Sequence, residues 1–235
     1  MFGQRASSQI VTSPPSRMRL FTWKYCEFAL GARTFIHSGR RGRSATGSDR
    51  CIGASVGIVV PEAPVERTEH GSRPVSAGWF VVNVRETRWF GNELGRNGLL
   101  DSEDARFDQV GVAVGMILPG QPNAMYHAED AQEDFLVLSG ECVLIVEGQE
   151  RRLKAWDFVH CPPMTEHVFI GAGDGPCVVL AVGARRKGRA LVYPVNAAAL
   201  KYGAGVEQET SEPSVAYGRF AEDIPVPPPE ELPDF

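Results

Sequence analysis

The chain has 235 residues, of which 43% are hydrophobic, and its formal net charge is −5. This length allows one domain with extensions or two small domains, and the hydrophobic content is ordinary for a globular core. The modest negative charge gives no indication of nucleic-acid binding. The longest apolar runs, such as Cys177–Ala184, are far shorter than the roughly 20 residues of a membrane-spanning helix. We therefore expect neither nucleic acid nor a membrane as partner.

The five cysteines are few, odd in number and irregularly spaced, and no CxxC pair occurs. This usage predicts neither a disulfide framework nor a cysteine-rich zinc module. It favours a reducing environment, and we expect the protein to be cytoplasmic.

Residues 1–55 form a basic segment, with nine Lys and Arg against two Asp and Glu, whereas the remainder is acidic. The Arg- and Ser-rich composition is similar to that of an organelle transit peptide. Alternatively, translation starts later and the segment has no structural role. We expect a disordered extension, because the segment has no sustained hydrophobic periodicity.

Residues 56–109 are expected to supply strands and a loop that pack on the main body. Gly78–Asn83 is apolar and predicts a strand, and Thr87–Phe90 predicts a short extended piece or a 3₁₀ turn. The polar, glycine-containing stretch Gly91–Phe107 predicts a loop.

Residues 110–184 contain short apolar runs separated by Gly and Pro turns, with no helical window between them. Strands at this spacing predict an all-β sandwich or barrel. Residues 185–235 begin with a basic loop, Arg185–Arg189, which is either a solvated surface loop or a phosphate-binding one. Asn196–Gly203 predicts a short helix, because it has an N-cap residue, helix formers and a C′ glycine. An acidic, Pro-rich tail follows.

Candidate metal ligands are concentrated at the start of one apolar strand. His127, Glu129 and Glu133 lie within seven residues, and His167 follows downstream. Carboxylates avoid buried positions unless they are paired or bound to a metal. Residues two apart on a strand share a face, so His127 and Glu129 are expected to project together.

These residues resemble the two motifs of the cupin superfamily, in its single-domain form. The first motif, Gly-x5-His-x-His-x(3 or 4)-Glu-x6-Gly, matches at His127, Glu133 and Gly140, with Glu129 in place of the second histidine. The second, Gly-x5-Pro-x-Gly-x2-His-x3-Asn, matches at Pro162 and His167. In this second motif Trp156 and Met164 replace the two glycines, and Gly171 replaces the asparagine.

The resemblance implies a small double-stranded β-helix barrel, a jelly roll, that holds a divalent metal ion. His127, Glu129, Glu133 and His167 are the expected ligands, and their chemistry suits Fe, Mn, Ni or Zn. The alternative is a metal-free pocket in which Glu129 and Glu133 pair with basic residues such as Arg151 or Lys154.

The expected function is that of a metal-dependent enzyme, an oxygenase, isomerase or lyase, acting on a small polar molecule. Glu129 and His160 are the candidate acid–base residues. Two other functions stay open: a non-catalytic ligand- or metal-sensing barrel, and a metal-free, epimerase-like enzyme. The resemblance also implies a homodimer.

Overall fold

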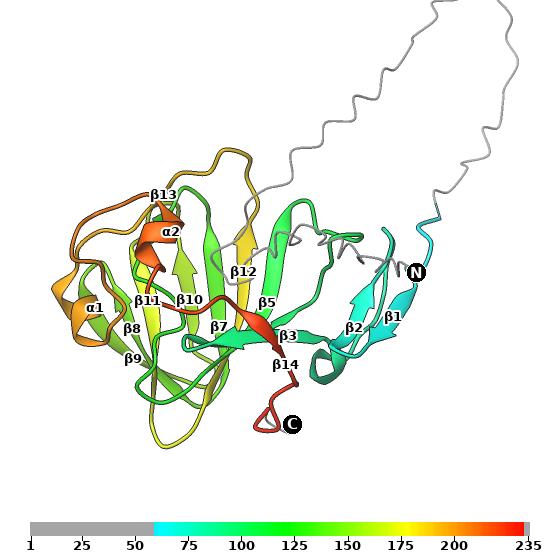
Figure 1. Ribbon diagram of the computed structural model, residues 1–235, viewed down its shortest axis with the longest axis horizontal. Helices are drawn as coiled ribbons and strands as arrows, with labels where there is room; N and C mark the ends of the chain where they lie inside the picture. Colours follow the sequence, from blue (N-terminus) through cyan, green and yellow to red (C-terminus); the bar gives the residue numbers. More distant parts are fainter. Residues whose placement is uncertain (1–58, 233–235) are drawn as a thin grey trace, which may run out of the picture.

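The computed structural model describes residues 59–232, so the expected N-terminal extension, residues 1–55, lies outside the described part of the chain. Two antiparallel sheets dominate the fold (Figure 1). The larger has the strand order β10-β7-β12-β5-β4-β3-β14, and the smaller has the order β11-β8-β9. The predicted all-β fold is confirmed, and its helices are few and short.

The secondary-structure elements of the described chain have the following bounds: β1 Val65–Thr68, β2 Gly71–Pro74, the 3₁₀ helix η1 Val84–Glu86, β3 Arg88–Asn92, β4 Gly95–Leu99, β5 Val110–Ile117, β6 Ala128–Glu129, β7 Glu133–Ser139, β8 Glu141–Val146, β9 Gln149–Lys154, β10 Phe158–Cys161, β11 His167–Ala172, β12 Cys177–Ala184, β13 Leu191–Val192, α1 Ala197–Lys201, α2 Pro213–Ala216 and β14 Ile224–Val226.

The main hydrophobic core lies between the two sheets. Alternate residues of β7 and β8 point into it, as the period of two along a strand requires. Phe135 and Val137 come from the larger sheet, and Leu144 and Phe169 come from the smaller one. Phe135 and Phe169 are in contact, with ring centroids 4.8 Å apart. Two strands of this core, β7 and β11, begin at the candidate ligands Glu133 and His167.

The smaller sheet is covered on its other face by the helix α1 (Figure 1). Ala199 of α1 packs there with Ile145 and Val168. The helix begins as the sequence predicts, because the Asn196 side chain accepts hydrogen bonds from the backbone N–H groups of Ala198 and Ala199. Strand β8 is consequently buried on both faces.

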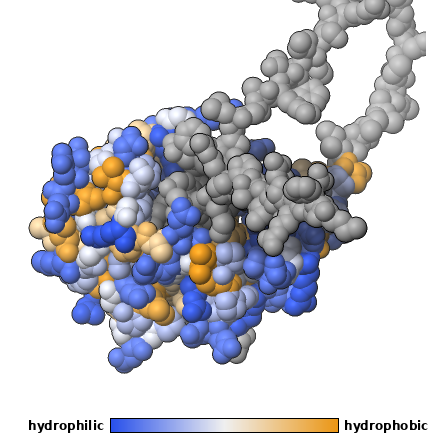
Figure 2. Space-filling model, in the orientation of Figure 1, coloured by the Kyte–Doolittle hydropathy of each residue, from blue (hydrophilic) through white to orange (hydrophobic). Residues whose placement is uncertain are grey.

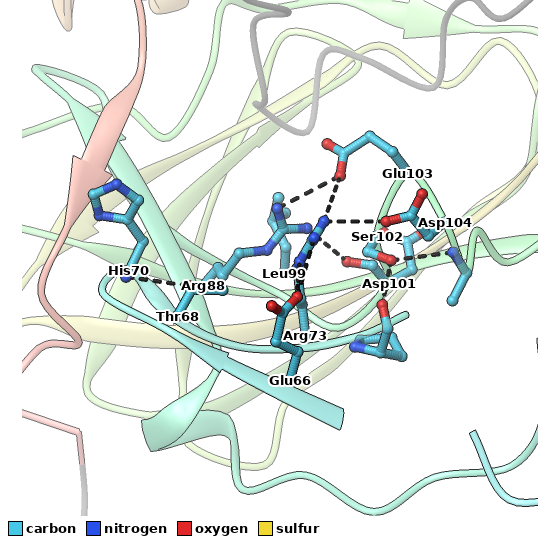
Figure 3. A network of polar contacts seen from close by, with 12 residues as sticks. Glu66, Thr68, His70, Arg73, Arg88, Leu99, Asp101, Ser102, Glu103 and Asp104 are labelled. Atoms are coloured by element: carbon cyan, nitrogen blue, oxygen red, sulfur yellow. Dashed lines mark hydrogen bonds and ion pairs between the residues drawn. The ribbon is translucent and has the colours of Figure 1, made fainter. Parts of the chain in front are cut away.

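The β1–β2 hairpin is tied to the body by an ion-pair network (Figure 3). The Arg73 guanidinium lies 3.2 Å from Glu66 and 3.3 Å from Asp104, and Arg88 lies 3.5 Å from Glu103. The acidic partners are about half exposed, so solvent screens each pair and its contribution to the free energy of unfolding is modest. We infer that the network orients the hairpin relative to the rest of the protein.

The described part of the visible face is mostly hydrophilic, with separate hydrophobic patches (Figure 2).

Two local predictions for residues 56–109 are wrong. Gly78–Asn83 forms no strand: Trp79 makes one isolated bridge to Glu62, and Val81 is exposed. The expected loop Gly91–Phe107 contains β4, which pairs with both β3 and β5. Pairing on both edges, with the adjacent β3 and with β5, overrides the weak local propensity of this glycine-rich stretch.

In residues 59–232 no helix has the length and apolar character needed to cross a membrane.

Candidate metal centre

His127 and His167 lie directly opposite each other in an antiparallel bridge. The backbone N–H of His127 donates to the carbonyl of His167 at 3.2 Å, and the reverse bond is 2.9 Å. Directly opposed residues of an antiparallel pair project to the same face. The two imidazole rings accordingly lie 4.9 Å apart, centroid to centroid.

Both rings are fixed by the backbone through their Nδ1 atoms. His127 Nδ1 lies 2.8 Å from the carbonyl oxygen of Met125, and His167 Nδ1 lies 3.0 Å from that of Thr165. A carbonyl oxygen only accepts, so in these contacts Nδ1 carries the proton. In the neutral ring Nε2 then has its lone pair available, which is the usual arrangement of a metal-binding histidine.

Glu133, the first residue of β7, is the third member of this group. Its Oε2 lies 3.5 Å from His167 Nε2 and 4.0 Å from His127 Nε2. One ligand atom from each of these residues lies within 4.8 Å of the others, and all three residues are buried. Two ligands about 2.1 Å from one ion are at most about 4.2 Å apart, so the group fits a divalent cation after small side-chain movements.

The electrostatics of the group favour a cation. Burial raises the pKa of Glu133 to about 7, against the opposing effect of Arg189. Burial, and then the negative charge of Glu133, raise the pKa of Glu129 to about 8, although Arg189 acts in the opposite direction. Burial lowers the pKa of His167. A bound cation would stabilise both carboxylates and the neutral imidazole.

Glu129 lies beside this group but is paired with Arg189. The Arg189 guanidinium donates from Nη1 to Glu129 Oε2, and the two side chains are 5% and 0% exposed. The other carboxylate oxygen, Oε1, lies 3.8 Å from His127 Nε2. The expected partners Arg151 and Lys154 are instead exposed on β9. The structure therefore brings three of the four predicted ligands into one group, with Glu129 at its border.

A tight turn immediately before β11 positions His167. The backbone N–H of Thr165 donates to the carbonyl of Pro162, with Pro163 and Met164 between them. Met164 has φ 68°, the conformation that the third residue of a type II turn requires. Trp156, which replaces the other motif glycine, also has a positive φ, 76°. The chain thus keeps the backbone shape at both positions where the motif has glycine.

His160, predicted as a catalytic residue, lies outside this group. Its side chain is 51% exposed, and its Nδ1 lies 2.6 Å from Asp134 Oδ1. Strand alternation turns the neighbouring Cys161 into the main core instead. The structure places His160 on the outer face of the larger sheet, away from His127 and Glu133.

Arg189 and Tyr193 border the site and were not among the predicted site residues. Tyr193 is buried, and its ring centroid lies 6.1 Å from that of His127. Both residues lie near β13, which pairs with β6 across about 60 positions of sequence. The only sequence signal was the basic loop that contains Arg189.

Comparison with known families identifies the barrel. Residues 113–183 match the family model described as a cupin domain. This segment is a cupin domain. It contains His127, Glu133 and His167, whereas Arg189 and Tyr193 follow it in the sequence. We found no curated protein with significant similarity to the chain.

Several solved structures are similar to part of the chain. A putative sugar phosphate isomerase from Acidithiobacillus ferrooxidans shares 27% identity over 35% of this chain and 55% of its own, with a TM-score of 0.34. A predicted oxalate decarboxylase from Thermotoga maritima shares 21% identity over 45% of this chain and 99% of its own, with a TM-score of 0.41. The match to the Acidithiobacillus protein thus spans only about half of that protein.

Proposed function

We propose that the cupin domain binds a divalent transition-metal ion through His127, Glu133 and His167, and that the protein is an enzyme acting on a small polar molecule. One observation carries the proposal. Both histidines are anchored through Nδ1, so their Nε2 atoms and the Glu133 carboxylate meet in one buried space. Structural histidines that only fill a core do not need this shared orientation toward a carboxylate.

Two imidazoles and one carboxylate suit Fe(II), Mn(II), Ni(II) or Zn(II). When bound, such an ion would polarise an oxygen of the substrate or supply open coordination positions for it. Oxygenase, isomerase and lyase reactions all use these properties. The ligand set is buried, which keeps bulk water away from it, and Glu129 adds a carboxylate beside it.

Elemental analysis of purified protein tests the metal site. Wild type is expected to carry stoichiometric metal, and His127→Ala, Glu133→Ala and His167→Ala are expected to lose it. His160→Ala is the matched control, because His160 is an exposed histidine outside the group, and it should retain the metal. A wild type without metal, or triad variants that bind it like wild type, would refute the proposed site.

Turnover distinguishes an enzyme from a sensing module. Substrate consumption or O₂ uptake that disappears on chelation and returns with metal supports a metal-dependent enzyme. Tight ligand retention without turnover would instead indicate a binding barrel, and activity that survives exhaustive chelation would indicate a metal-free enzyme.

The homodimer is a further proposal. Strand β10 is an edge of the larger sheet, and its first residue, Phe158, and the preceding Trp156 are exposed. Exposed aromatic residues at a sheet edge are a surface on which a second copy can pack. Light scattering coupled to size exclusion measures the oligomeric state, and Phe158→Ser should shift a dimer toward monomer.

A further inference from the structure

We propose that Arg189 is a positioning residue that keeps Glu129 out of the metal's ligand set, as a separate carboxylate beside it. The inference rests on the proposed metal site. It assigns this chain a three-residue set, His127, Glu133 and His167, although four candidate ligands lie close together. Glu129 would then accept a proton or a hydrogen bond from the molecule that is bound to the metal.

The first support is the way in which Arg189 is held. Its guanidinium bonds Glu129 Oε2, and both side chains are buried. The backbone enforces this pairing: Leu191 is the register partner of Glu129 in the β6–β13 pair, and the N–H of Asp130 donates to the carbonyl of Ala190 at 2.9 Å. Removing one partner of a buried ion pair leaves an uncompensated charge, which is strongly unfavourable. Arg189 therefore determines where the Glu129 carboxylate lies.

The second support is the contrast between the two carboxylates. Glu133 lies within 4.0 Å of the Nε2 atoms of both histidines. Glu129 contacts His127 but does not belong to the group whose ligand atoms are all mutually close. Its attachment to Arg189 accounts for this displacement toward the β13 side of the site.

The third support is an atom without a partner. Glu129 Oε1 is buried and makes no hydrogen bond within residues 59–232, and neither does Arg189 Nη2. Buried polar atoms are normally satisfied, so an acceptor left open beside His127 Nε2 indicates that a ligand supplies the missing donor. A carboxylate that keeps one oxygen on Arg189 and presents the other to the site is suited to this role.

Cobalt(II) titration of the metal-free full-length protein tests the inference, because the d–d absorption of Co(II) reports its coordination. Glu129→Gln keeps a side-chain oxygen for Arg189, and we expect the wild-type spectrum and affinity. Arg189→Met releases Glu129, and we expect a changed spectrum with roughly tenfold altered affinity. The double variant Arg189→Met with Glu129→Gln should return to the wild-type spectrum, and so should Arg189→Lys, which keeps a cationic donor.

The inference fails if Glu129→Gln changes the cobalt spectrum as Glu133→Gln does, because Glu129 would then be a ligand. It also fails if folded Arg189→Met has the wild-type spectrum. If Arg189→Met does not fold, Arg189→Gln takes its place, because it also removes the cation; the same changed spectrum is expected, and a wild-type spectrum is again the failing result. A wild type that binds no cobalt would refute the metal site itself, and the inference with it. If wild type binds cobalt but one of the two failing spectra is observed, only the role of Arg189 is refuted.

Discussion

His127 and His167 exchange both of their backbone hydrogen bonds across an antiparallel bridge, which sets their side chains side by side. The same bridge joins the segment before β6 to the first residue of β11. Glu133 adds the start of β7 to this junction. A metal ion held by all three residues would therefore cross-link three separate segments of the barrel.

Metal removal should lower the stability of the protein. A ligand that binds only the folded state at 100 times its Kd contributes about 2.7 kcal/mol to the free energy of unfolding. Urea unfolding with and without a chelator measures this contribution. His167→Ala provides the control, because a protein that cannot hold the ion should unfold identically in both conditions. Coincident wild-type curves would contradict the prediction.

The metal-free protein should become less stable as the pH rises from about 6.5 to 8. Glu133 and Glu129 have folded-state pKa values raised to about 7 and about 8. The folded state therefore binds more protons than the unfolded state in this window, and stability falls as the pH increases. Below pH 6.5 the lowered pKa of His167 acts in the opposite direction, because the unfolded chain takes up that proton more readily.

Urea unfolding of chelated protein at several pH values between 6.5 and 8 checks this dependence. The double variant Glu129→Gln with Glu133→Gln removes both titrating groups and should flatten the profile. A wild-type stability that increases across the window would show that the carboxylates are not protonated as their burial requires.

Phe169→Ala should destabilise the barrel by about 3–5 kcal/mol, the usual cost of removing a fully buried Phe side chain. Phe169 packs between the sheets against Phe135, with 1% of its surface exposed. Val81→Ala is the control, because Val81 is 83% exposed and its truncation should change the free energy of unfolding by about 0.5 kcal/mol or less. Equal effects in urea unfolding would place the core elsewhere.

Gly98→Ala should destabilise the protein by about 1–3 kcal/mol through overpacking. Gly98 is paired with Trp89, and an added Cβ would lie 2.8 Å from that ring. The ring has little freedom to move, because it is fully buried and its Nε1 donates to the Val84 carbonyl at 3.0 Å.

Gly175→Ala is the control for this substitution, because an added Cβ there meets no atom within 4 Å. It should be neutral or stabilise by up to about 1 kcal/mol through the unfolded chain. Thermal or urea unfolding of both variants gives the comparison. A Gly98→Ala protein as stable as Gly175→Ala would mean that Trp89 relaxes freely.

The sequence by itself determined the all-β barrel and the three residues of the candidate centre. Turn residues between short apolar runs are a local signal, and local signals suffice for strands joined by tight turns, such as β7 and β8. His127, Glu133 and His167 were recoverable because motif spacing reflects strand alternation and turn length, which are fixed by backbone geometry.

Only the tertiary structure decided the position of Glu129, the exclusion of His160 and the existence of β4. Arg189 reaches Glu129 through the pairing of β13 with β6, and the sequence carries no local trace of that contact. Strand alternation allowed either His160 or Cys161 to face inward. The choice depended on which face of β10 lies against the core between the two sheets. Glycine-rich β4 is a strand because β3 and β5 flank it. In each case the deciding interaction is a strand pairing or a packing contact, which local propensity does not report.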